Sequence, residues 1–83
     1  MIKVCLADNY PVVHFGVKSY FKDHSDISIV ANVGNFSMVK DVLYTKEIDV
    51  LVLDLDLDGL SSIYELKAII KNYTKTKIIV FSS

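Results

Sequence analysis

The stretch IDVLVLD, residues 48 to 54, decides between two folds for this chain of 83 residues. Its apolar side chains occupy consecutive positions without helical spacing, which is typical of a strand buried on both faces. The next stretch, DLDLDGLSSIYE (residues 54 to 65), matches a calcium-loop pattern at every fixed position, from Asp54 to Glu65. The same letters are therefore compatible with an EF-hand or with a strand that leads into a loop and a helix.

The residues around Asp54 favour the strand. An EF-hand needs a helix that runs directly into its loop, because this geometry aims the ligands. Here VLVL precedes Asp54, and Leu55 and Leu57 occupy loop positions that are usually polar or glycine. We therefore expect a strand that ends at Asp54, and we keep calcium binding by residues 54 to 65 as an alternative.

Strands and helices are predicted to alternate along the rest of the chain. Short apolar runs predict strands at residues 2–7, 27–33, 48–54 and 78–83. Amphipathic spacing predicts helices at about residues 11–24, 36–46 and 61–73. Pro11 suits the first turn of a helix, and Ser62 with Glu65 fits a capping box. The order βαβαβαβ predicts an α/β fold with a parallel sheet and helices on both faces.

Composition excludes several classes of protein. The chain is 52% hydrophobic with three glycines and one proline, as expected of a packed globular unit. Its net charge is -1 and it contains no arginine, so we expect no direct binding to nucleic acid by this segment. Apolar runs of about four residues are too short for a membrane span, and we expect a soluble, cytoplasmic protein.

Cys5 is the only cysteine, so an internal disulfide and a thiolate metal cluster are excluded. It lies in an apolar run, and we expect an unreactive core side chain. His14 and His24 lie ten residues apart on the first predicted helix. They are not an i, i+4 metal pair, and surface or capping roles are expected for both.

Polar side chains follow three of the predicted strands at their carboxyl ends. Asp8 and Asn9 follow the first strand, Asp54 ends the third, and Ser82 lies at the end of the fourth. Ligands of parallel sheets gather at these ends. If the first and third strands are neighbours, two carboxylates and an amide form an oxygen-rich pocket suited to Mg²⁺. An aspartate beside such a cation can attack a phosphoryl group, and a hydroxyl such as that of Ser82 can hydrogen-bond the product.

Three segments in register resemble the receiver domain of a two-component response regulator. They are LADNYPVVHFGV (6–17), LVLDLDLDG (51–59) and IIVFSS (78–83). The P-x-V-x-x-G-V spacing and VANVGNF (30–36) most resemble receivers of LuxR-type transcription factors. The resemblance covers the whole chain, residues 1–83. It implies a flavodoxin-like sheet of order 2-1-3-4, without the fifth strand and the last two helices of that family.

The resemblance also implies roles for particular residues. Asp54 would accept phosphate from a histidine kinase or phosphotransfer protein. Asp8, Asn9, Asp54 and the backbone carbonyl of Asp56 would hold Mg²⁺, and Ser82 would be the switch hydroxyl. The chain would be a signalling domain rather than an enzyme, with at most a limited self-catalysed phosphotransfer. Transcriptional control would act through a separate DNA-binding output domain.

Departures from the family pattern leave a second interpretation open. Asn9 stands where the family usually has an acid, and Asp58 stands where a proline commonly precedes the glycine. We hypothesise that the Asp56 side chain partly restores the pocket's charge. The lysine that ends the family's fifth strand is absent from this chain. The alternative is a degenerate receiver that acts by protein contact without phosphorylation.

The fourth predicted strand has no fifth strand to cover it. An exposed apolar edge invites pairing with another chain. We therefore expect a homo-oligomer that forms through Ile78 to Phe81.

Overall fold

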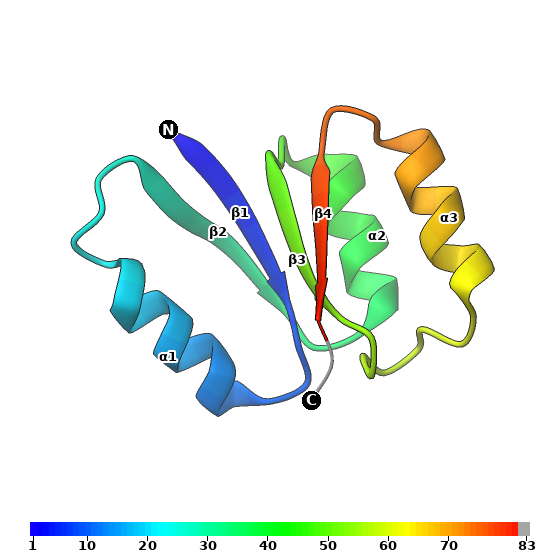
Figure 1. The fold of residues 1–83 in the computed structure, drawn as a ribbon, viewed down its shortest axis with the longest axis horizontal. Coiled ribbons are helices and arrows are strands. Elements are labelled where there is room, and N and C mark those ends of the chain that lie inside the picture. The colour runs from blue at the N-terminus through cyan, green and yellow to red at the C-terminus, as the bar shows by residue number, and fades with distance from the viewer. Residues whose placement is uncertain (82–83) are drawn as a thin grey trace.

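The structure, a computed structural model, describes residues 1–81, in which strands and helices alternate (Figure 1). The elements are β1 (Ile2–Ala7), α1 (Pro11–Phe21), β2 (Ile27–Val33), α2 (Phe36–Thr45), β3 (Val50–Asp54), α3 (Ile63–Asn72) and β4 (Lys77–Phe81). The predicted alternation is confirmed. No helix among the residues described is long and apolar enough to cross a membrane.

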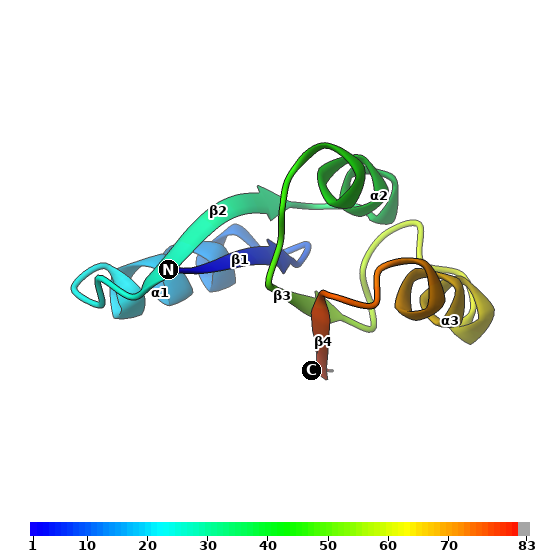
Figure 2. The same cartoon turned by 90° about the horizontal axis from the view of Figure 1, so that it is seen from above.

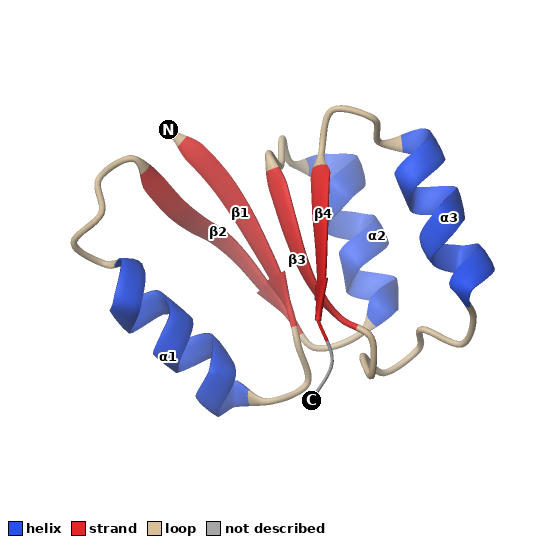
Figure 3. Cartoon of the chain, in the orientation of Figure 1, coloured by secondary structure: helices blue, strands red, loops and turns tan. Residues whose placement is uncertain are grey.

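The four strands form one parallel sheet of order β2-β1-β3-β4 (Figure 3). This is the predicted strand order. In the register, Ala7 of β1 pairs with Leu53 of β3 and with Val33 of β2. The carboxyl ends of β1 and β3 therefore lie side by side at one edge of the sheet.

Helices cover both faces of the sheet, as predicted (Figure 2). One face packs against α2 and α3 in a closed core, which contains Cys5, Ala7, Leu51 and Leu53 from the central strands. Cys5 is fully buried, and burial raises the pKa of its thiol to about 11. The expectation that Cys5 is a core side chain is confirmed.

Within residues 1–81, the opposite face is covered only by α1, which has no fully buried residue. Between α1 and the sheet lies an apolar groove of about 380 Å³. Its lining residues are Ile2, Val4, Leu6, Val17, Phe21, Ile27, Ile29, Val50, Val52 and Ile79. The hydrophobic core is thus closed on one side of the sheet and open on the other.

The bounds of several elements differ from prediction. Helix α1 ends at Phe21 rather than at residue 24, because the chain turns there: the His24 N–H donates to the Phe21 carbonyl at 3.0 Å, a tighter bond than that of an α-helix. Strand β3 begins at Val50 instead of Ile48. Strand β4 begins one residue early at Lys77 and is described to Phe81. The other bounds agree within two residues.

The predicted capping box at α3 is wrong in one partner. The Ser62 side chain makes no capping hydrogen bond. The Glu65 carboxylate instead accepts hydrogen bonds from the backbone N–H and the hydroxyl of Ser61. These bonds lower the pKa of Glu65. The glutamate therefore stabilises the start of α3, as predicted, but through the preceding serine.

Candidate functional site

Asp8 and Asp54 are the only charged side chains buried among the residues described, each 1% exposed. Asp8 directly follows β1, and Asp54 ends β3. Since Ala7 pairs with Leu53 in the parallel register, the two aspartates occupy neighbouring positions at the sheet edge. The structure therefore brings together the two carboxylates that the sequence analysis selected.

The two carboxylates are held in the same way. Oδ1 of Asp8 accepts the N–H of Tyr10 at 2.6 Å, and Oδ1 of Asp54 accepts the N–H of Asp56 at 2.9 Å. Oδ2 of each is buried and has no hydrogen-bond partner among residues 1–81. Two unpaired buried carboxylate oxygens are costly unless a cation or donor satisfies them.

Asn9 connects the end of β1 to the loop after β3. Its Oδ1 accepts the backbone N–H of Asp58 at 3.0 Å. Its Nδ2 donates to the backbone carbonyl of Asp56 at 3.0 Å and to Oδ1 of Asp58 at 3.4 Å. The amide thus binds the same carbonyl that was predicted to be a metal ligand.

The donor set fits a hard cation in part. The two carboxylates are suited to Mg²⁺, which is usually held by one or two carboxylates and retains several waters. Two further oxygens, the Asp56 carbonyl and the Asn9 amide oxygen, each already accept a hydrogen bond. Only their second lone pairs are therefore available for a metal. Within the described part of the chain, no group of three or more His, Cys, Asp and Glu is placed to hold a metal ion.

The calcium-loop interpretation is wrong. Asp54 ends a strand, not a helix, and Leu57 at an intervening loop position is buried. Glu65, the last position of the pattern, accepts its hydrogen bonds from Ser61. The acids of residues 54 to 65 therefore do not surround one ion.

The 56–59 loop is also tied to the start of α2, a contact that the sequence analysis missed. The Phe36 N–H donates to the Asp58 carbonyl at 2.7 Å, and Asn35 forms a parallel bridge with Asp58. Gly59 has φ of 85°, a left-handed conformation that favours glycine. The glycine indicates a turn from the sequence alone. The contacts of Asp58 with Asn35 and Phe36 could not be predicted, because these residues lie far apart in the sequence.

Three other predicted residues have separate outcomes. Ser82 lies outside the described residues. His24 is exposed and stacks on Tyr20 with ring centroids 6.1 Å apart, so its surface position is confirmed. His14 is half-buried instead, and its Nε2 is buried without a hydrogen-bond partner in the described chain.

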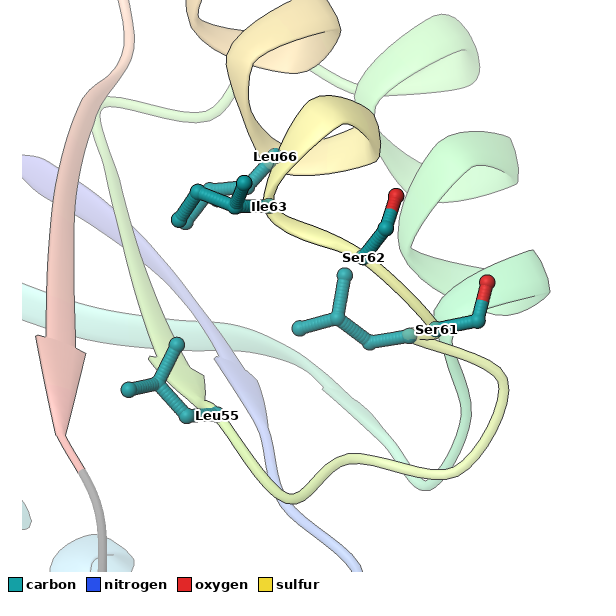
Figure 4. Close-up of a pocket in the computed structure, with 6 residues that line it drawn as sticks. Leu55, Ser61, Ser62, Ile63 and Leu66 are labelled. Carbon is teal, nitrogen blue, oxygen red and sulfur yellow. The ribbon is translucent and has the colours of Figure 1, made fainter.

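A second, shallower pocket of about 260 Å³ lies beside this site, between the residue after β3 and the start of α3 (Figure 4). It is lined by Leu55, Leu60, Ser61, Ser62, Ile63 and Leu66. Leu55 is 43% exposed although it directly follows the buried Asp54. The surface next to the acidic site therefore combines apolar side chains with two serines on the side of α3.

Comparisons with known proteins identify a consistent set of relatives. No family model matches the chain. The transcriptional regulatory protein LiaR of Bacillus subtilis is 28% identical over 83 residues, which cover 100% of this chain and 39% of LiaR. The Fimbriae Z protein of Escherichia coli is 25% identical over 80 residues, covering 96% and 38%. The nitrate/nitrite response regulator NarP of Escherichia coli is 26% identical, covering 96% and 37%.

Solved structures share the fold. The receiver domain of the stress response regulator RcsB from Escherichia coli matches with a TM-score of 0.89 and 24% identity, over 96% of this chain and 63% of that one. The isolated receiver domain of RcsB from Salmonella enterica serovar Typhimurium, solved with the phosphomimetic BeF₃⁻, matches with a TM-score of 0.87. The resemblance to receivers of this class of response regulators is confirmed. The chain spans well under half the length of the curated relatives it matches.

Proposed function

We propose that this chain, a receiver domain similar to those of NarL-type and RcsB-type response regulators, accepts a phosphoryl group on Asp54. One observation carries the proposal: Asp8 and Asp54 are buried at neighbouring positions at the carboxyl ends of β1 and β3, each with one unpaired carboxylate oxygen. This is the position at which parallel sheets bind their ligands. In this proposal the chain is a signalling domain and not an enzyme that turns over a substrate.

The residues of the pocket divide the chemistry between them. The Asp56 N–H holds Oδ1 of Asp54, which leaves Oδ2 as the attacking oxygen. Oδ2 attacks the phosphorus of a phosphohistidine in a kinase or phosphotransfer protein: a P–O bond forms, and the P–N bond breaks. The departing imidazole keeps the electron pair and takes up a proton.

Asp8 and Asp54 would hold Mg²⁺, with the Asp56 carbonyl and the Asn9 amide oxygen as further ligands. Bound there, the ion supplies positive charge that offsets repulsion between the carboxylates and the phosphoryl oxygens. Ser82 is proposed to hydrogen-bond the phosphoryl group. Transcriptional control through a DNA-binding output domain, homo-oligomers through β4 and a cytoplasmic location complete the proposal, and each stays a prediction.

A second candidate function has one observation in its favour. The Asp54 side chain is 1% exposed, and the loop that follows it is tied to Asn9 by three hydrogen bonds. A phosphoryl donor reaches Oδ2 only after neighbouring residues move aside. A receiver that keeps this arrangement would act by protein contact without phosphorylation.

Intact-protein mass spectrometry tests the choice. The chain is incubated with a small phosphodonor and Mg²⁺, and separately with beryllofluoride and Mg²⁺. A phosphoryl adduct that disappears in Asp54→Asn is expected, because the amide is not a nucleophile. The matched control is Asp41→Asn, which alters an exposed carboxylate on α2 and should keep the adduct. Absence of any adduct or beryllofluoride binding would leave the second candidate.

A further inference from the structure

The amide of Asn9 lies among acidic groups and supplies what they lack, hydrogen-bond donors. Its Nδ2 is 3.0 Å from the Asp56 carbonyl and 3.4 Å from the Asp58 carboxylate, while its Oδ1 accepts the Asp58 N–H at 3.0 Å. These contacts join residues 47 and 49 positions apart in sequence. The Asn9 side chain therefore joins the 56–58 loop to the end of β1.

We propose that Asn9 is an internal clamp that holds this loop in place without a divalent cation, and that it gives the pocket a lower affinity for Mg²⁺ than an aspartate at the same position would. The Asn9 side chain donates to the Asp56 carbonyl and so occupies one lone pair of an oxygen proposed to bind the ion, and a neutral amide brings no negative charge to the pocket. Asn9 is a positioning residue in this inference and takes no part in phosphoryl transfer. The effect on Mg²⁺ rests on the proposed function, whereas the holding of the loop does not.

Replacement of Asn9 by aspartate or alanine separates the two effects. Asn9→Asp loses both donated hydrogen bonds and places a negative charge beside the Asp58 carboxylate and near two buried acids. A third carboxylate in the pocket, however, is a better ligand for a hard cation than an amide. Asn9→Ala loses all three hydrogen bonds and gains no ligand. Both variants should weaken the loop without metal, and only the aspartate should strengthen Mg²⁺ binding.

The experiment measures the melting temperature in EDTA and in Mg²⁺, together with Mg²⁺ titrations followed by NMR at the Asp56 and Asp58 amides. We expect both variants to melt about 5 °C lower than the native chain in EDTA. In Asn9→Ala, which removes the acceptor of the Asp58 N–H, the Asp58 amide proton should exchange faster with solvent. Mg²⁺ should restore Asn9→Asp but not Asn9→Ala, with an affinity on the order of tenfold above that of the native chain.

Asn72→Asp is the control, because it makes the same chemical change at an exposed residue of α3. It should leave Mg²⁺ affinity and Asp58 exchange unchanged. Equal melting temperatures and equal Asp58 exchange in all chains would overturn the inference. If the native chain binds Mg²⁺, an Asn9→Asp variant with no higher affinity would also overturn it. If both Asn9 variants are destabilised and no chain binds Mg²⁺, the clamp is supported and the proposed cation site fails.

Discussion

The Glu65 carboxylate is the one acid of the 54–65 stretch that stabilises a helix instead of lying at the sheet edge. It accepts two hydrogen bonds from Ser61 and lies in the first turn of α3, where the helix dipole favours negative charge. The hydrogen bonds from Ser61, first that of its hydroxyl and then that of its backbone N–H, hold the pKa of Glu65 below its usual range. Its contribution to stability therefore depends on pH.

The predicted sign follows from this lowered pKa. A group whose pKa is lowered on folding stabilises the folded state above the pKa of the unfolded chain and loses that effect as pH falls through the folded value. Glu65→Gln should therefore have a lower free energy of unfolding than the native chain at neutral pH. This difference should shrink as pH falls below the ordinary glutamate pKa of about 4.3. Urea unfolding of both chains between about pH 7 and pH 3 checks this. A difference that stays constant over this range would contradict it.

Single residues also mark how far the sequence could predict the site. Asp8 and Asp54 were predictable, because strand ends are readable from apolar runs and parallel strands end at a common edge. The hydrogen bonds of Asn9 were not, because their partners lie 47 and 49 residues away and depend on the path of the 56–58 loop. The partner of Glu65 was missed by one residue, since Ser61 and Ser62 are equivalent in a capping pattern.

Among the elements of residues 1–81, β4 combines an unpaired backbone edge with exposed apolar side chains. It is an edge strand, and Ile79 and Val80 are 55% and 39% exposed. The Lys77 N–H donates to Asp49, and the Phe81 carbonyl accepts from Leu55, so these alternate residues face the β3 side. Backbone groups in a parallel ladder alternate in direction, and those of Ile78 and Val80 therefore point away from the sheet.

This geometry gives a test of assembly through β4. Val80→Pro removes an outward N–H and should block pairing with a second chain while preserving the ladder to β3. Ile79→Pro, the matched control, removes an inward N–H and should destabilise the fold itself. Light scattering across a concentration series should show association of the native chain and a monomer for Val80→Pro. A native chain that is monomeric at all concentrations would contradict the proposed oligomer.

Helix α1 shows why element bounds were less predictable than element order. His24 continues the spacing of Tyr20 and Phe21 beyond the end of the helix, yet the backbone turns after Phe21. Their rings instead contact one another, with Phe21 and His24 centroids 5.6 Å apart. Apolar periodicity indicates which side chains can lie on one face. A turn with contacts between neighbouring rings fits this pattern as well as another helical turn does, so the pattern does not predict where the helix ends.

At the scale of the whole molecule, the two faces of the sheet differ in how completely they are packed. The face under α2 and α3 contains the closed core cluster, whereas the face under α1 has an apolar groove of about 380 Å³. Consecutive apolar residues along β1 and β3 predicted that both faces are apolar, because strands buried on both sides lack polar alternation. It could not predict that one face would be covered by a single helix without a buried residue.

Equivalent substitutions on the two faces should therefore have unequal costs. Val33 on β2 is 3% exposed within the closed core, whereas Val52 on β3 lines the open groove. Val33→Ala should lower the free energy of unfolding by about 2 kcal/mol, since it removes buried methyl groups and leaves a cavity. Val52→Ala should cost about half as much, because its surroundings are already open and no new enclosed cavity forms. Urea unfolding at one pH measures both, with unchanged m-values as the control for the unfolded state. Equal losses would mean that the groove is filled in solution, so that the second face is as closed as the first.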